Sequence, residues 1–213
     1  CDTVGVLDPL QIYKRVKALV DAVDIAVEMH THNDFGMATA NAIAGLEAGA
    51  TYVNTTVNGL GERAGNASME ELVMALRYTK GVQMNIQTSL FRELSEYVAL
   101  ASGRAIPTWK PVVGGNLCVY ESEGRASGVI RDPATYEMFL PGEVGLMRRF
   151  SVGKYSGITV VSRKLREQGY HASREELEKL VPLLRSRAIA LKRSLFDNEV
   201  IEAYLMFRER KIA

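Results

Sequence analysis

Residues 27–36 read VEMHTHNDFG and residues 53–66 read VNTTVNGLGERAGN, and the predicted fold follows from these two stretches. The first ends an apolar run in His30 and His32, two of the three histidines in the chain. On a β-strand this spacing points both imidazoles to one face, where they could bind one divalent metal ion. A polar strand end without metal is the alternative for the pair taken alone. The second stretch strengthens the metal hypothesis, because a strand-like segment runs there into a glycine-rich turn just before a helix.

The composition is that of a globular protein with 213 residues, 47% hydrophobic and 24% charged, which allows one large domain or two modest ones. A formal net charge of +1 gives no indication of a nucleic-acid or membrane surface. Cys1 and Cys118 are too few for a disulfide framework, and no signal-like or long apolar segment is present, so we expect a cytoplasmic location. The absence of an initiator Met suggests a fragment or a processed product.

The first 80 residues alternate between strand and helix patterns. We expect strands over residues 3–7, 25–30 and 50–57, and helices from Pro9, over 37–48 and from 69 to near Gly81. Asp8 and Pro9 are the expected N-cap and first position of the first helix. Short connections between such elements predict parallel βαβ units with right-handed crossovers. Ligands of this architecture gather at the carboxyl ends of the strands, where Thr3, both histidines and the 58–66 turn fall.

Past residue 80 the pattern becomes mainly helical. Helices are expected over residues 88–101, 158–168 and 198–208, and 102–116 is expected to be a linker with a surface role. Capping boxes are expected at Ser68 with Glu71 and at Ser173 with Glu176. Pro182 is expected to kink or break the helix that it interrupts.

Residues 30–36 and 53–66 together resemble the signature of the isopropylmalate synthase and homocitrate synthase family. Its members are metal-dependent enzymes that condense an acyl-CoA with a 2-oxo acid and are built on a TIM barrel. Residues 2–9 (DTVGVLDP), 110–114 (KPVVG) and 133–137 (PATYE) make the likeness strongest to nitrogen-fixation-type homocitrate synthases. The resemblance implies an acyltransferase of amino-acid biosynthesis or nitrogen fixation that forms homocitrate from acetyl-CoA and 2-oxoglutarate.

The same resemblance implies an α/β fold, in which the chain supplies the C-terminal part of a TIM (β/α)8 barrel followed by small α/β and helical subdomains. Residues 1–80 would be the last βα units of the catalytic barrel, and residues 81–107 a helical linker. Residues 108–157 would form subdomain I, which covers the active site of a partner in a homodimer. Residues 158–213 would form the helical subdomain II.

The resemblance also implies a metal and substrate site. His30 and His32 are implied to bind a divalent metal (Mg, Mn or Zn) that holds the 2-oxo acid and polarises its ketone for attack by the enolate of acetyl-CoA. Asn66 is implied to lie close to the metal. Thr3 is implied to bind a carboxylate of the oxo acid.

Two further residues are implied to act in catalysis, each with a structural alternative. Glu62 is similar to a buried acid beside the acetyl group, and the alternative is a salt bridge between Glu62 and Arg63. Tyr136 matches a tyrosine that reaches into the partner's active site. The alternative for Tyr136 is an aromatic ring packed inside a small domain.

The chain departs from the family at two histidines. Residues 120–125 read YESEGR where the family has His-Glu-Ser-Gly-x-His, and residues 153–157 read GKYSG where it has Gly-Lys-His-Ser-Gly. Arg125 therefore replaces a histidine implied to act as general acid or base, and an arginine stays protonated near neutral pH. If condensation runs, we expect Glu62 or Tyr136 to take the proton. Arg125 would then be a fixed positive charge toward the enolate oxygen or the CoA phosphates.

A complete barrel of this kind needs eight strands and about 250 residues, whereas this chain shows three strand patterns. The segment that carries the family's third metal ligand and a catalytic arginine has no counterpart in the sequence. The chain is therefore expected to be a fragment, or a subunit that completes its barrel with a separate chain. Two alternatives stay open: condensation with another 2-oxo acid, giving 2-isopropylmalate, citramalate or citrate, and a non-catalytic metal-binding or regulatory relative.

Overall fold

The computed structural model describes residues 2–212, with side chains through residue 209. The chain divides into two compact units, Cys1–Leu117 and Cys118–Ala213. Cys1 and Ala213 themselves lie outside the described residues. The finer division at residues 80, 107 and 157 stays a prediction.

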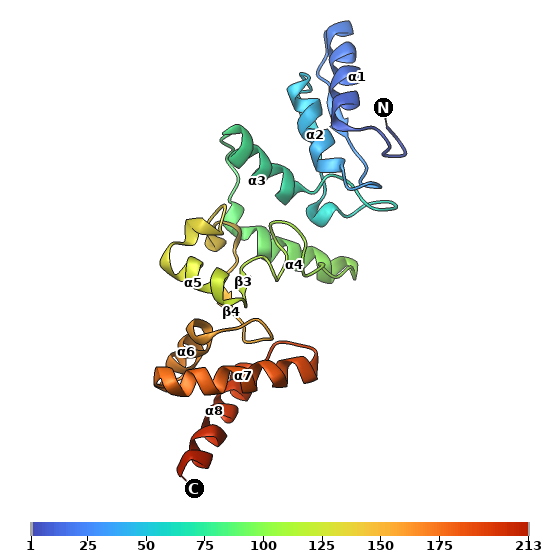
Figure 1. Ribbon diagram of the computed structural model, residues 1–213. Helices are drawn as coiled ribbons and strands as arrows, with labels where there is room; N and C mark the ends of the chain where they lie inside the picture. The colour runs from blue at the N-terminus through green and yellow to red at the C-terminus, as the bar shows by residue number, and fades with distance from the viewer. Residues whose placement is uncertain (1, 213) are drawn as a thin grey trace. The chain divides into compact units, whose positions relative to one another are not determined.

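In the first unit, helix α1 (Pro9–Ala22) begins where the sequence predicts. The Asp8 carboxylate accepts a hydrogen bond from the Gln11 backbone N–H at 2.8 Å, and the Gln11 side chain accepts one from the Asp8 N–H at 3.1 Å. Pro9 fills the first helical position, where no backbone N–H is needed. The apolar face of α1 is buried in a core shared with α2 (Ala38–Glu47), and the two helices lie side by side (Figure 1).

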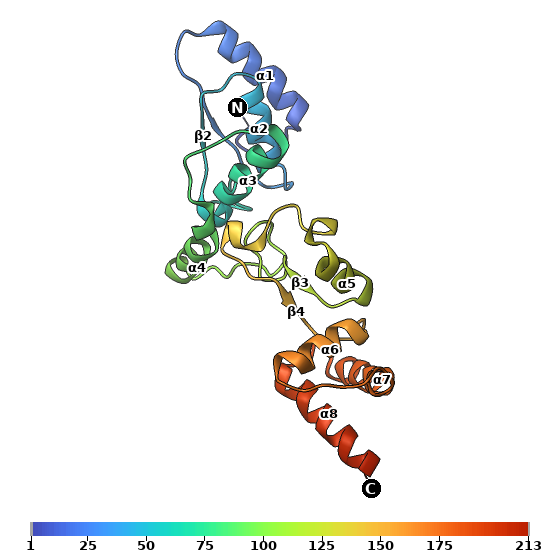
Figure 2. The ribbon, with the colours of Figure 1, turned by 90° about the vertical axis from the view of Figure 1, so that its left-hand side faces the viewer.

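Two strands of this unit pair in parallel, as the βαβ pattern predicts. They are β1 (Glu28–His30) and β2 (Tyr52–Asn54), of which β2 is labelled in Figure 2. In their pairing His30 lies opposite Asn54. Both are shorter than predicted. Within residues 2–117 they form a two-stranded sheet rather than a closed barrel.

The strand predicted over residues 3–7 is wrong. The chain turns there instead, and the Asp2 carboxylate accepts the backbone N–H groups of Val6 at 3.0 Å and Leu7 at 2.9 Å. In a strand these two donors would point to opposite edges and bond to the strands on either side. The Asp2 carboxylate accepts both N–H groups instead, because short acidic side chains compete with strand pairing for nearby backbone donors.

The second half of the first unit is helical. The 3-10 turn η1 (Val57–Gly59) precedes α3 (Met69–Lys80), which ends at Gly81 in the left-handed region with φ +67°, as predicted. After η2 (Thr88–Leu90), helix α4 runs over Phe91–Ser102.

The capping box predicted at Ser68 and Glu71 is wrong. Ser68 makes no capping hydrogen bond; Lys110 Nζ donates instead to Ser68 Oγ at 3.3 Å and to Glu71 Oε1 at 2.6 Å. Lys110 belongs to the predicted linker, which is rich in turns but only partly a surface segment. Trp109 is 81% exposed there, whereas Val113 is fully buried.

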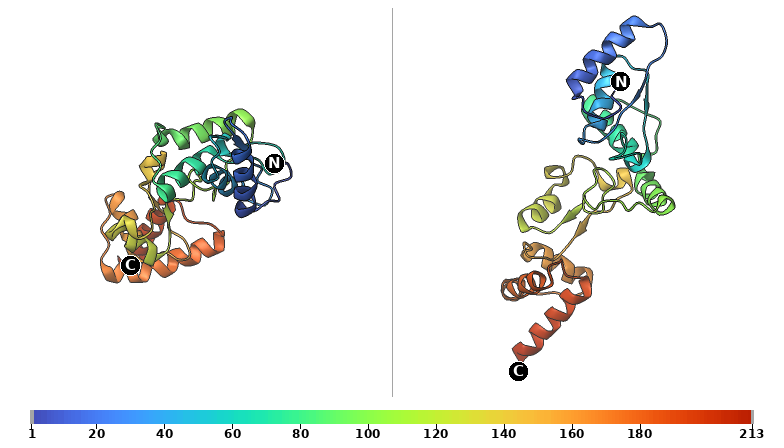
Figure 3. Two further views of the ribbon diagram at one scale, coloured as in Figure 1. Left: turned by 90° about the horizontal axis from the view of Figure 1, so that it is seen from above. Right: turned by 90° about the vertical axis from the view of Figure 1, so that its right-hand side faces the viewer.

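The second unit combines a small parallel sheet with a cluster of helices around one apolar core. β3 (Val119–Tyr120) pairs in parallel with β4 (Arg149–Phe150). The short helices between these strands in the chain are α5 (Glu123–Arg131), η3 (Pro133–Thr135) and η4 (Pro141–Val144). Three longer helices follow and pack on one another (Figure 3): α6 (Ile158–Glu167), α7 (Arg174–Leu191) and α8 (Asp197–Ile212).

Local signals predict most of this helical part correctly. Gly169, with φ +80°, follows the end of α6. The capping box that starts α7 is confirmed, because Ser173 Oγ accepts from the Glu176 N–H at 3.2 Å and the Glu176 carboxylate accepts from the Ser173 N–H at 2.8 Å. Pro182 does not break the helix, and the alternative that it kinks the helix stays a prediction. Helix α7 continues through it, with Leu180 fully buried in the core two residues earlier.

Among residues 2–212, none of the helices combines the length and the apolar character that crossing a bilayer requires.

Helix α7 offers a matched pair of leucines for testing the core of the second unit. Leu180→Ala is expected to lower the free energy of unfolding of this unit by about 2–5 kcal/mol, because it leaves a cavity among close-packed side chains. Leu183→Ala, three residues along at a side chain that is 56% exposed, is the control and should change it by less than about 1 kcal/mol. Urea denaturation followed by circular dichroism measures both. Equal losses in the two variants would contradict this packing.

Candidate metal and substrate site

The two histidines of the predicted metal pair lie at the carboxyl end of β1. Their rings stand perpendicular to each other with centroids 4.9 Å apart. His30 Nδ1 lies 3.2 Å from Asn54 Oδ1 on the neighbouring strand, so this contact orients the ring and leaves Nε2 for a ligand. The parallel pairing of β1 with β2 therefore sets the position of the first imidazole.

The turn over residues 58–66 brings Asn66 to the second histidine. Asn66 and His32 pair through an isolated antiparallel β-bridge, and the Asn33 N–H donates to Gly65 O at 2.9 Å. Inside the turn the Asn66 N–H donates to Gly59 O at 3.0 Å. The structure thus places three of the predicted metal-site residues together.

Two side-chain atoms of this group are buried without a hydrogen-bond partner, His32 Nδ1 and Asn66 Oδ1. Buried polar atoms are nearly always bonded, and each exception costs about 1–3 kcal/mol. Imidazole nitrogen and amide oxygen are both metal ligands, so the residues present fit a divalent ion. No cluster of three or more His, Cys, Asp or Glu side chains occurs in the described part of the chain, so the donor set here is two imidazoles and one amide.

Arg63 ties the same turn to two other segments. Its Nε and Nη2 bond to the two oxygens of Asp34 at 2.9 and 3.0 Å, and Nη2 also donates to the Thr3 carbonyl at 2.7 Å. The guanidinium hydrogen bonds lower the pKa of the Asp34 carboxyl and raise the pKa of Arg63. Thr3 is therefore brought to the site by its backbone. The alternative of a Glu62–Arg63 salt bridge is wrong, because Arg63 pairs with Asp34.

Asp34 was not among the predicted site residues, although it lies two residues beyond the histidine pair. The Asp34 carboxylate also lies close to the backbone of Gly5, which has φ +67°. A Cβ on Gly5 would lie 2.9 Å from Asp34 Oδ2. The available signal was a carboxylate just after the His-x-His motif. Its partner lies 29 residues away in the chain, so spacing alone did not reveal the pair.

The predicted catalytic residues are divided between the two units. Glu62 lies on the 58–66 turn and is exposed, so the burial that the resemblance implies is not seen in this chain. Arg125 lies exposed in the first turns of α5. Tyr136 is 49% exposed, which does not support the alternative of a fully packed aromatic. One edge of its ring lies against Gly128, where a Cβ would come within 2.7 Å of the ring.

A largely buried polar cluster of Tyr120, Glu137 and Arg148 was not predicted from the sequence. Arg148 bonds to both oxygens of Glu137 at 2.7 and 2.6 Å, and the Tyr120 hydroxyl donates to Glu137 at 3.1 Å. Burial, together with the nearby Glu137 charge, raises the pKa of Tyr120 to about 12. The hydrogen bond from Arg148 lowers the pKa of Glu137. Burial likewise raises the pKa of the free thiol of Cys118.

The two segments that lack family histidines contact each other within the second unit. The Tyr155 N–H donates to Glu121 Oε1 at 3.1 Å, and the Glu123 carboxylate accepts the Thr159 N–H at the start of α6. A Cβ on Gly153 or Gly157 would overlap these carboxylates. The segments are therefore closely packed, with the Tyr155 ring exposed.

Comparison with known proteins gives the family. Residues 1–98 match the HMGL-like family model, and residues 112–192 match the model described as homocitrate synthase post-HMGL domain-like. The chain belongs to the isopropylmalate and homocitrate synthase family. The family motifs at the histidines and at the 58–66 turn coincide with the residues that the structure brings together.

Three relatives show how far the similarity extends. The chain is 56% identical to 2-isopropylmalate synthase 2 of Caldanaerobacter subterraneus, over 96% of this chain and 53% of the relative. It is 54% identical to homocitrate synthase 1 of Nostoc, over 94% and 53%, and 45% identical to 2-isopropylmalate synthase of Sulfolobus acidocaldarius, over 89% and 49%. The chain spans about half the length of these curated relatives.

Gly65 provides a test of the turn. It has φ +92°, and a Cβ there would overlap Gly59 O, so Gly65→Ala is expected to cost about 3 kcal/mol or more of stability and to open the turn. Gly36→Ala is the control: it has φ +75° with nothing within 4 Å, and only the conformational cost of about 1–2 kcal/mol applies.

Urea denaturation gives the two stabilities, and amide hydrogen exchange over residues 59–66 reports on the turn. Unchanged exchange in Gly65→Ala would contradict the close approach of Gly65 to Gly59.

Proposed function

We propose that the whole protein to which this chain belongs condenses acetyl-CoA with a 2-oxo acid. The observation that carries the proposal is that His32 Nδ1 and Asn66 Oδ1 are both buried without a hydrogen-bond partner, on two residues that a β-bridge pairs across the family's two characteristic segments. Without a bound ligand these two buried polar atoms would have no bonding partner, which is unfavourable, and a metal ion would supply one.

The proposed oxo acid is 2-oxoglutarate, with homocitrate as product. The segments DTVGVLDP, KPVVG and PATYE support this choice, as does the homocitrate synthase relative from Nostoc. The second candidate is 2-oxoisovalerate, with 2-isopropylmalate as product. It is supported by the relative from Caldanaerobacter, which carries that name at 56% identity.

The residues of this chain have the following proposed roles. His30, His32 and Asn66 hold a divalent metal, which when bound supplies Lewis-acid polarisation of the ketone. Arg63 holds the turn and the Thr3 backbone in place, and Thr3 binds a carboxylate of the oxo acid.

Proton transfer from the acetyl methyl group is assigned to Glu62 or Tyr136. Arg125 supplies a fixed positive charge toward the enolate oxygen or the CoA phosphates, a role that suits a permanently charged guanidinium. The exposure of Glu62, Arg125 and Tyr136 leaves all three side chains free to contact a substrate or a second subunit.

The proposed architecture is a TIM barrel of which this chain contributes the last βα units. The parallel pairing of β1 with β2 supports it. The remaining strands belong to another part of the protein or to a separate chain. We further propose a homodimer in which subdomain I covers the partner's active site, so that each site is composite.

Thiol release from acetyl-CoA by the whole protein tests the reaction and its substrate. 2-Oxoglutarate is expected to support the fastest release among 2-oxoglutarate, 2-oxoisovalerate, pyruvate and oxaloacetate. Chelation should abolish release and Mn2+ should restore it. His32→Ala is expected to lower kcat/KM by about 100-fold or more through loss of the metal, whereas His171→Ala, at an exposed loop histidine, should leave it unchanged. Release that is indifferent to chelation and to His32→Ala would contradict the proposal.

Arg125→His tests the proposed role of the arginine. If Arg125 acts as a fixed charge in a working site, the variant should lose about 10-fold or more in kcat near neutral pH, because a neutral imidazole cannot replace the charge. Arg131→His, at the other end of α5, is the matched control and should have no effect. A large gain in turnover would instead indicate that histidine is the better catalyst and that this site has weakened. An unchanged rate would mean that Arg125 takes no part in the reaction.

A further inference from the structure

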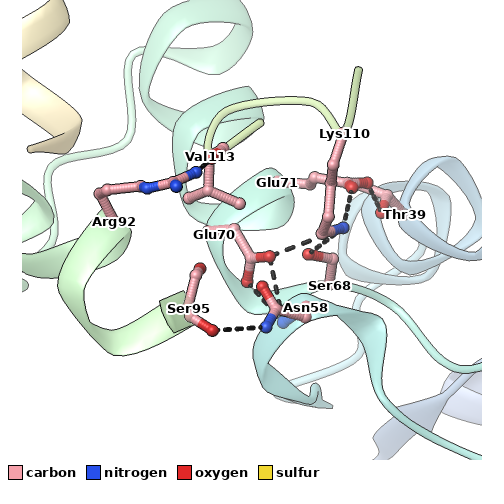
Figure 4. Close-up of polar contacts among 9 residues, drawn as sticks. All are labelled: Thr39, Asn58, Ser68, Glu70, Glu71, Arg92, Ser95, Lys110 and Val113. Atoms are coloured by element: carbon pink, nitrogen blue, oxygen red, sulfur yellow. Dashed lines mark hydrogen bonds and ion pairs between the residues drawn. The ribbon is translucent and has the colours of Figure 1, made fainter. Parts of the chain in front are cut away.

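Glu70, in the first turn of α3, is a buried carboxylate with a defined partner in the metal-site turn. Its side chain is only 1% exposed. Both of its oxygens accept the backbone N–H of Asn58, at 3.1 and 3.2 Å (Figure 4). A carboxylate placed only to complement the positive end of a helix would stay in solvent, so its burial against Asn58 calls for another explanation.

Asn58 is the residue at which the 58–66 turn begins. It adopts φ +61°, which is uncommon outside glycine, and its side chain Nδ2 donates to Ser95 O of α4 at 3.0 Å. Gly59 follows directly and accepts the Asn66 N–H. Glu70 therefore binds the residue that precedes Gly59, and the Gly59 carbonyl is the group that accepts the Asn66 N–H.

Lys110 supplies the charge that lets Glu70 be buried. Its Nζ lies 3.6 Å from Glu70 Oε1 and 2.6 Å from Glu71 Oε1, and the side chain is 10% exposed. The segment that carries Lys110 is fastened nearby, because Arg92 of α4 donates to Val113 O at 2.5 Å. Helices α3 and α4 and the 103–117 segment thus converge on the start of the turn (Figure 4).

The neighbouring acid, Glu71, has different contacts. It binds Lys110 and accepts from Thr39 Oγ1 of α2 at 3.1 Å, and its hydrogen bonds in the structure reach no backbone group of the 58–66 turn. Two adjacent carboxylates therefore share one lysine, and one of them holds the turn.

We propose that Glu70 is a positioning residue for the metal site, which fixes Asn58 in its left-handed conformation and so keeps Asn66 paired with His32. This inference rests on the metal site of the proposed function. Lys110 holds the Glu70 carboxylate in place as its ion-pair partner, and Ser95 holds the Asn58 side chain from the other side.

Titration of the whole protein with Mn2+ alone, without substrates, tests the inference by calorimetry. Glu70→Gln replaces one of the two oxygens that accept the Asn58 N–H by an NH2 donor and removes the charge that faces Lys110. It is expected to weaken Mn2+ binding by about 10-fold or more, the usual loss when the support of a metal ligand is disturbed. Glu71→Gln removes an equivalent charge from the same lysine and is expected to stay within about two-fold of the wild type. Melting temperatures of both variants separate loss of stability from loss of metal affinity.

The outcomes are distinct. Unchanged Mn2+ affinity in Glu70→Gln, or an equal loss in Glu71→Gln, would overturn the inference while leaving the metal site standing. Absence of Mn2+ binding by the wild-type protein would overturn the proposed function and this inference with it.

A second pair of variants keeps the inference testable if Glu70→Gln does not fold. Asn58→Gly and Asn58→Ala both remove the bond to Ser95, but only alanine resists the left-handed conformation. Asn58→Ala is expected to bind Mn2+ about five-fold or more weakly than Asn58→Gly. Equal affinities would show that the conformation of this residue does not control the site.

Discussion

The bidentate contact of Arg63 with Asp34 is the interaction on which the site of the first unit depends. It joins the loop after the histidine pair to the glycine-rich turn, and the same guanidinium holds the Thr3 carbonyl. The pair is exposed, so its contribution to stability is small. Its value is geometric, because the planar fork of an arginine fits both oxygens of a carboxylate in one orientation. Three segments far apart in the sequence are thereby held next to one another in a fixed orientation.

The site retains conformations that an ordinary turn would avoid. Asn58 and Arg63 have positive φ without being glycine, at 61° and 54°, and Gly59 and Gly65 are also left-handed. Strained backbone of this kind persists where surrounding contacts determine it, and it is concentrated at functional sites. The buried carboxylate of Glu70 is one such contact. Contacts from α3 and α4 thus offset the conformational strain of the turn.

Structural features that depend on only a few neighbouring residues were predicted well from the sequence. The caps at Asp8 and Ser173 and the helix stop at Gly81 depend only on residues within one turn. The family motifs likewise predicted that His30, His32 and Asn66 lie together, since each belongs to a characteristic segment.

Features that depend on distant partners were not predictable in this way. The capping box at Ser68 failed because Lys110, 42 residues away, binds the serine and the glutamate that would have formed it. The strand at residues 3–7 failed because Asp2 takes its donors. The Tyr120–Glu137–Arg148 cluster and the buried position of Glu70 arise from tertiary packing, which no local spacing encodes.

The buried thiol of Cys118 is a natural probe of local opening in the second unit. Burial beside Glu137 disfavours the thiolate, and only the thiolate reacts quickly with alkylating reagents. Labelling at this position therefore requires the β3 region to open first. The labelling rate, read by mass spectrometry of the peptide that contains Cys118, measures how often that opening occurs, without any introduced probe.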